Sequence, residues 1–193
     1  MPEARDLALF RWGEELRRRR AALNLGRRRI AAVALVAALA TATLLTLLWP
    51  PRPLLVWNAS ASSPVGLYRV SAAEGLARGE MVVAWAPADA RTLAAWRHYL
   101  PANVPLVKRV AAIAGDWVCA EGELIFVNDA LVARRLRADP SGRPLPWWSD
   151  CRMLRHGETF LLMSGGATSF DGRYFGITGR HDIVGRARLI WAG

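Results

Sequence analysis

The feature that most constrains this chain is an uninterrupted apolar run from Ile30 to Trp49, which contains no charged residue, glycine or proline. As a helix, its 20 residues would extend about 30 Å, the thickness of the hydrocarbon core of a membrane. A helix in a soluble core carries polar residues along one face, whereas this run offers only three threonines. The run therefore predicts a transmembrane helix over residues 30–49.

Basic residues crowd the N-terminal side of this run. The chain carries a net charge of +10. Residues 1–29 hold nine arginines against four acidic residues, so this segment contributes +5, which is half of the net charge. Segments rich in arginine next to a membrane span stay on the cytoplasmic side. We therefore expect a cytoplasmic tail at residues 1–29, a single-pass anchor at 30–49 and an exported domain at 54–193.

The apolar run and the arginine-rich tail each have a second interpretation. The stretch Ala38-Leu39-Ala40 is typical of a signal-peptide cleavage site, although the apolar run is longer than the apolar region of most signal peptides. An arginine-rich tail is also typical of nucleic-acid binding. Because membrane topology already accounts for the charge, we expect no nucleic-acid partner.

The exported region consists of short apolar runs separated by Gly, Asn, Asp and Pro. Runs of this length between turn residues predict β-strands, here at residues 81–85, 106–113, 117–120, 124–127, 130–133, 159–163 and 183–191. One helix is expected from an N-cap at Asp89 to Leu100, before Pro101. The proline- and glycine-rich residues 138–151 predict a long exposed loop. The predicted fold class is therefore mainly β with one short helix.

Cys119 and Cys151 are the only cysteines, and both lie in the exported region. In an oxidising compartment such a pair is expected to form a disulfide. The three histidines, His98, His156 and His181, lack the spacing of metal ligands. We therefore expect neither a metal nor another cofactor.

Lys108 is the only lysine among 26 basic residues. An arginine side chain stays charged at any working pH, whereas burial can neutralise a lysine, which can then take a proton from a serine hydroxyl. Alternation along residues 106–113 places Lys108 on an apolar strand face. The serines at 60, 62 and 63 are the candidate nucleophiles. A Ser-His-Asp triad using His181 with Asp182, or His156, is not favoured by any spacing.

Four motifs occur in a fixed order along the exported region. They are Ser-x-Pro-x-Gly-x-Tyr (Ser62–Tyr68), Lys-Arg-Val (Lys108–Val110) followed by Gly115-Asp116, Ser-x-Asp-x-Arg-Tyr-Phe-Gly (Ser169–Gly176), and Gly185-Arg186-Ala187. In this order the chain resembles the signal peptidase I family of Ser/Lys proteases. Within that family it resembles the conjugative-transfer branch of TraF-type pilin-processing peptidases.

The resemblance implies a signal-peptidase-like β-fold and a role for each matching residue. Ser62 would be the nucleophile and Lys108 its general base, and the Ser60 hydroxyl would join the backbone N–H of Ser62 in the oxyanion hole. The supporting residues would be Ser169, which orients the lysine, and the ion pair of Asp171 with Arg173. This sequence has Gly172 where the family has a small hydroxyl residue, and Ser63 where housekeeping signal peptidases have Met.

The implied function is that of a membrane-anchored serine endopeptidase that forms an acyl-enzyme. Its location would be the inner membrane of a bacterium, with the catalytic domain in the periplasm. Its substrates would be exported precursors, above all conjugative pilin or mating-channel subunits, and its partners components of a conjugation or type IV secretion system. A general signal peptidase and a non-enzymatic assembly factor of such a channel are the alternatives.

Overall fold

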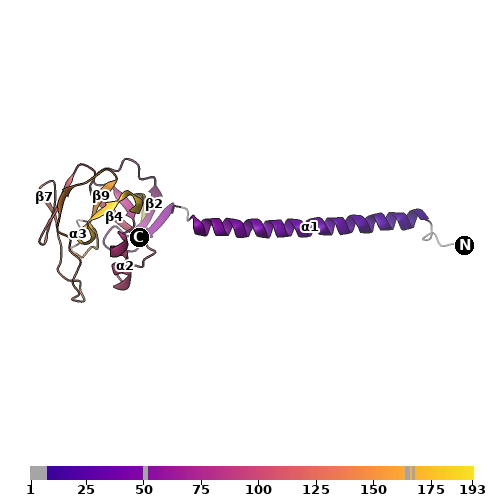
Figure 1. The fold of residues 1–193 in the computed structure, drawn as a ribbon, viewed down its shortest axis with the longest axis horizontal. Helices are drawn as coiled ribbons and strands as arrows, with labels where there is room; N and C mark the ends of the chain where they lie inside the picture. Colours follow the sequence, from indigo (N-terminus) through magenta and orange to yellow (C-terminus); the bar gives the residue numbers. More distant parts are fainter. Residues whose placement is uncertain (1–7, 50–51, 164–165, 167) are drawn as a thin grey trace. The chain divides into compact units, whose positions relative to one another are not determined.

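In a computed structural model, residues 8–49, 52–163, 166 and 168–193 are described. The chain divides into two compact units at the border between residues 51 and 52. Figure 1 shows the first unit as one long helix and the second as a β-domain with short helices.

The first unit contains α1, a single helix from Ala8 to Leu48. The helix therefore continues without a break through the arginine-rich segment, and no boundary separates the expected tail from the expected span. The hydroxyls of Thr41 and Thr43 donate to the carbonyls four residues earlier at 2.8 and 2.9 Å, so these polar groups are satisfied within the helix. Among the described residues, α1 is the one helix long and apolar enough to cross a membrane, which fits an anchor or a signal sequence.

The second unit contains a seven-stranded antiparallel sheet in the order β1-β2-β11-β3-β4-β9-β10. Its strands are β1 (Leu55–Asn58), β2 (Gly66–Ser71), β3 (Met81–Ala84), β4 (Leu106–Ala112), β9 (Glu158–Leu162), β10 (Ile177–Gly179) and β11 (Ile183–Ala192). A four-stranded sheet in the order β7-β6-β5-β8 is formed by β5 (Trp117–Glu121), β6 (Leu124–Val127), β7 (Ala130–Arg134) and β8 (Cys151–Met153). The prediction of a mainly β fold is confirmed.

The hydrophobic core joins the two sheets and covers both faces of β4. One buried cluster combines Ala112 of β4 and Phe160 of β9 with Val118 and Ile125 of the smaller sheet. Because successive strand residues face opposite sides, Val107 and Val110 pack into two different clusters. β4, which carries Lys108, is therefore held rigidly at the centre of the domain.

The helix prediction was partly wrong. Helix α2 spans Ala88–Trp96, its N-cap is Pro87, and Asp89 lies in the first turn, where its charge suits the helix dipole without capping. The helix ends early because His98 adopts a positive φ of 60°. A one-turn helix α3 (Gly172–Phe175) and a 3-10 turn at Arg180–Asp182 were not predicted.

The segment 138–151 packs onto the domain more closely than the sequence indicated. Asp139 is buried, and the indole N–H of Trp148 donates to the carbonyl of Gly172 at 2.9 Å. The Trp148 ring also packs edge-on against Phe160. At the end of the segment, a disulfide joins Cys119 of β5 to Cys151 of β8, which ties the segment to the smaller sheet.

Candidate active site

Three segments that are distant in the sequence bring serine and lysine side chains together. The loop between β1 and β2 carries Ser60 and Ser62, β4 carries Lys108, and the connection from β9 to α3 carries Ser169. β1 and β2 pair with Asn58 opposite Gly66, so the serine loop leaves and re-enters the sheet at one point.

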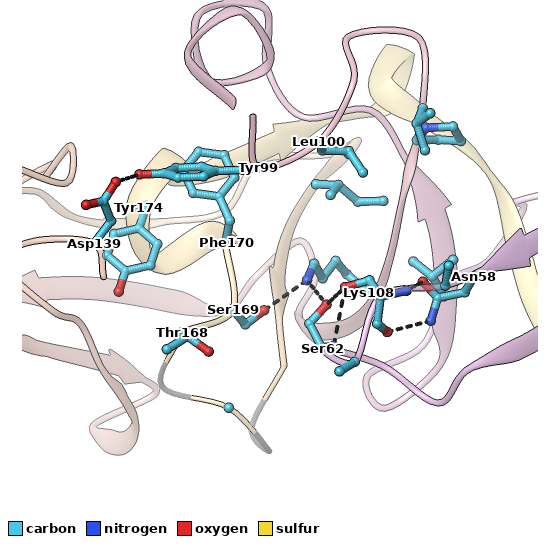
Figure 2. Close-up of a pocket in the computed structure, with 18 of the residues that line it drawn as sticks. Asn58, Ser62, Tyr99, Leu100, Lys108, Asp139, Thr168, Ser169, Phe170 and Tyr174 are labelled. Atoms are coloured by element: carbon cyan, nitrogen blue, oxygen red, sulfur yellow. Dashed lines mark hydrogen bonds between the residues drawn. The ribbon is translucent and has the colours of Figure 1, made fainter. Parts of the chain in front are cut away.

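Lys108 lies between two serine hydroxyls. Its Nζ is 2.8 Å from Ser62 Oγ and 2.9 Å from Ser169 Oγ (Figure 2). A neutral lysine amine has two N–H groups and one lone pair. If one N–H donates to Ser169, the lone pair is free to accept the hydroxyl proton of Ser62. This arrangement is the one that base activation of Ser62 requires.

Burial favours the neutral form of Lys108. The side chain is only 2% exposed, and loss of hydration lowers its pKa from 10.5 to about 8. The nearby charge of Asp171 raises this pKa and that of Arg173 lowers it, but both effects are smaller than that of burial. With a pKa of about 8, about a tenth of the lysine is uncharged at pH 7 and about half at pH 8.

Asp171 and Arg173 form a buried ion pair beside the lysine. Their Oδ1 and Nε atoms are 2.8 Å apart, and the two side chains are 0% and 3% exposed. Asp171 also accepts from the backbone N–H of Met163 at 3.1 Å, and Arg173 donates to the carbonyl of the same residue at 2.6 Å. The pair thus ties the end of β9 to α3 and fixes the segment that carries Ser169.

Gly172 lies where a side chain would collide with β9. A Cβ atom at this position would come within 2.6 Å of the Leu161 carbonyl oxygen and 2.7 Å of the Phe160 ring. The absence of a side chain at Gly172 therefore lets α3 pack directly against β9.

Asn58 holds the serine loop, and sequence reasoning missed it. Its side-chain N–H groups lie 2.9 to 3.1 Å from four acceptors: the carbonyls of Ser60, Ser63 and Pro64 and the hydroxyl of Ser63. Ser63 is buried and directed to this amide, whereas Ser62 is directed to Lys108, so the two adjacent serines are clearly distinguished. The only sequence signal was a polar residue at the end of an apolar strand.

The Ser60 hydroxyl is hydrogen-bonded to Ser62 and is not free to act as an oxyanion donor in this conformation. Its hydroxyl oxygen lies 2.9 Å from Ser62 Oγ and accepts from the Ser62 backbone N–H at 3.3 Å. The two expected donors to the oxyanion therefore bond to each other here. The N–H bond is long, so an incoming carbonyl oxygen can replace it at little cost.

A cavity of about 660 Å³ is lined by Asn58, Ser60, Ser62, Lys108 and Ser169, among others. His181 lies elsewhere, largely exposed and 3.1 Å from Asp182. Among the described residues, no hydrogen bond joins His181 or His156 to a serine, and no group of three or more His, Cys, Asp or Glu is placed to hold a metal ion.

Comparison with known proteins places the chain in a family. Residues 27–192 match the family described as signal peptidase, peptidase S26. A plasmid transfer protein TraF of Escherichia coli is 36% identical over 150 residues, which cover 69% of this chain and 82% of that protein. A conjugal transfer protein TraF of Agrobacterium fabrum strain C58 is 31% identical over 146 residues, covering 69% and 80%.

The crystal structure of a signal peptidase I from Enterococcus faecalis V583 is also similar. The match has 15% identity and a TM-score of 0.34, and it covers 60% of this chain and 98% of that one. The family match itself extends over all the serine, lysine, aspartate and arginine residues described above. The resemblance inferred from the motifs is thereby confirmed: the chain belongs to the signal peptidase family, peptidase S26.

Proposed function

We propose that this protein is a membrane-anchored serine endopeptidase in which Ser62 is the nucleophile and Lys108 the general base. The observation that carries the proposal is the position of Lys108 Nζ, desolvated and within hydrogen-bond distance of both Ser62 Oγ and Ser169 Oγ. This arrangement lets an uncharged amine take the serine proton without a histidine.

The reaction begins when Lys108 Nζ accepts the proton of Ser62 and Oγ attacks the carbonyl carbon of the substrate peptide. The Ser62 N–H and the Ser60 hydroxyl donate to the negatively charged oxygen that forms. The C–N bond then breaks, and the lysine ammonium gives its proton to the leaving amine. In the second half, the neutral lysine activates a water molecule that releases the acyl group from Ser62.

The substrates proposed are exported precursors, in particular pilin or mating-channel subunits of a conjugation system. The TraF relatives are named as plasmid or conjugal transfer proteins, which supports this class over general secretion. In this proposal α1 is an uncleaved anchor in the bacterial inner membrane. The arginine-rich end faces the cytoplasm, and residues 54–193 work in the periplasm. A substrate held in the same membrane meets the site at high effective concentration.

Acylation by a fluorophosphonate probe tests this function on the full chain in detergent micelles. The wild-type protein and the Ser63→Ala control should be labelled, with mass spectrometry locating the label on Ser62, whereas Ser62→Ala should remain unlabelled. An unlabelled wild-type protein would favour a non-enzymatic assembly factor. Mass spectrometry of exported proteins from cells with and without the chain would then identify the substrate.

A further inference from the structure

The cavity extends well beyond the serine and lysine side chains. Away from Ser62 it is bounded by an aromatic wall, which we define as Tyr99, Phe170 and Tyr174 (Figure 2). Phe170 follows Ser169 directly in the sequence, so the wall begins one residue from a hydroxyl that bonds to Lys108. The wall and the serine-lysine pair therefore belong to one continuous cavity.

The three rings support one another. Phe170 stacks on Tyr174 with ring centroids 6.0 Å apart and lies 5.5 Å from Tyr99 in a tilted arrangement. Phe175 packs edge-on against Phe170 at 5.7 Å but does not line the cavity. Phe170 is thus held between Tyr99 and Tyr174 while remaining only partly buried, which leaves part of its surface open to a ligand.

The polar atoms of the wall are already bonded within the protein. The Tyr99 hydroxyl donates to Asp139, whose carboxylate also accepts from Arg143 Nε at 2.7 Å. The Tyr174 hydroxyl accepts from the backbone N–H of Leu136 at 3.0 Å. Because these groups are paired and the Asp139 charge is balanced, the wall offers a ligand apolar surface and no unbalanced charge.

The rest of this part of the cavity is aliphatic, and its side chains are Leu100, Val104, Leu106, Leu136 and Leu145. Val104 and Leu136 are each 38% exposed. Apolar side chains that gather around a cavity while remaining exposed to water mark a binding site for an apolar group.

We infer that the aromatic wall is a substrate subsite that receives one bulky, uncharged apolar side chain, such as Phe, Leu or Met, of the peptide being cleaved. Because the wall and Ser62 line the same cavity, this side chain belongs close to the cleaved bond in the peptide sequence. The inference rests on the proposed peptidase function and adds a selection rule to it. A well-fitted apolar side chain is expected to favour cleavage about tenfold or more over alanine.

Cleavage of a proteome-derived peptide library by the full chain in detergent micelles tests the subsite. Mass spectrometry of the products gives the residue preference at each position around the cleaved bond. The wild-type protein should show enrichment of Phe, Leu or Met at one defined position close to that bond. Phe170→Ala, which widens the pocket, should reduce the enrichment at this position about tenfold, and Leu100→Trp, which fills it, should shift the preference to Ala and Ser.

The matched control is Phe175→Leu, which alters a ring that contacts Phe170 but lies outside the cavity lining. Its cleavage profile should equal that of the wild type. Absence of bulky enrichment in the wild type, or the same enrichment in Phe170→Ala and Leu100→Trp, would overturn the subsite. So would fluorophosphonate labelling of Ser62 without any cleaved peptide. Failure of the labelling itself would instead overturn the proposed peptidase function.

Discussion

The Nζ atom of Lys108 lies 2.8 Å from the Oγ atom of Ser62, although 46 residues separate the two in the sequence. The contact forms because a loop between β1 and β2 meets β4, an interior strand of the larger sheet. The hydroxyl of Ser169, from a third segment, is hydrogen-bonded to the same amine. Whether Lys108 can accept the Ser62 proton depends on its protonation state.

The first prediction concerns pH. Only neutral Lys108 can accept the Ser62 proton, and its pKa lies at about 8. The rate of Ser62 acylation should therefore rise about tenfold between pH 7 and pH 9 and then level off. Acylation rates with a fluorophosphonate across this range check the prediction, and a rate independent of pH would count against a titrating lysine.

The free energy of unfolding should also depend on pH through Lys108. The folded-state pKa of Lys108 is lower than the ordinary value of 10.5, so the unfolded chain binds more protons between about pH 8 and 10.5. The contribution of Lys108 therefore makes the folded state more stable as pH rises through this window. The free energy of unfolding by urea is measured across this pH range for the wild type and for Lys108→Met, which has no titrating group at this position. The difference between the two pH dependences is the contribution of Lys108.

The Ser169→Ala variant should lose the partner that orients the amine. Without the 2.9 Å hydrogen bond, the lone pair of Lys108 is no longer held toward Ser62, and acylation should slow about 100-fold. The loss should persist above pH 9, because it arises from orientation and not from the fraction of neutral lysine. Full recovery of the rate at high pH would show that Ser169 acts only on the pKa.

Asp171→Asn should destabilise the domain by leaving the Arg173 charge buried without its carboxylate partner. We expect a loss of about 3–5 kcal/mol in the free energy of unfolding, measured with urea. Since Asp171 raises the pKa of Lys108, the midpoint of the acylation profile should also move to lower pH. In the matched double variant, Asp171→Asn with Arg173→Met, stability should be partly recovered; a single variant as stable as the wild type would contradict this role.

Removal of the disulfide should affect stability and leave the chemistry intact. Cys119 and Cys151 close a loop across 32 residues, and Cys119→Ser with Cys151→Ser should lower the free energy of unfolding by about 3–4 kcal/mol. The bond lies in the smaller sheet, whereas the serine and lysine residues lie on the larger sheet and its loops. The acylation rate of the folded double variant should therefore equal that of the wild type.

The sequence predicted those parts of the structure that depend on local pattern. Strand β4 and the burial of Lys108 followed from alternation along residues 106–113. The end of α2 was missed because it depends on the backbone of His98 rather than on a proline. Strands β1, β2, β8 and β10 were also not predicted, so both the existence and the ends of elements were missed where the local pattern is weak.

The site was predictable where family motifs carry it and unpredictable where distant segments meet. Ser60, Ser62, Lys108 and Ser169 lie together as the motifs implied, while their catalytic roles stay predictions. The bond between Tyr99 and Asp139 joins residues 40 positions apart that belong to no motif. The role of Asn58 was also not predicted, because the four contacts of its amide form only once the serine loop is folded.

The most direct test of the central claim is the rate at which a fluorophosphonate acylates Ser62 in the Lys108→Arg variant. Arginine keeps a positive charge at this position and cannot deprotonate. The thermal unfolding of Lys108→Arg and of Lys108→Met, compared with the wild type, identifies the folded fraction to which each rate refers. Both folded variants should lose acylation of Ser62. Labelling of folded Lys108→Arg at the wild-type rate would contradict the role of Lys108 as general base.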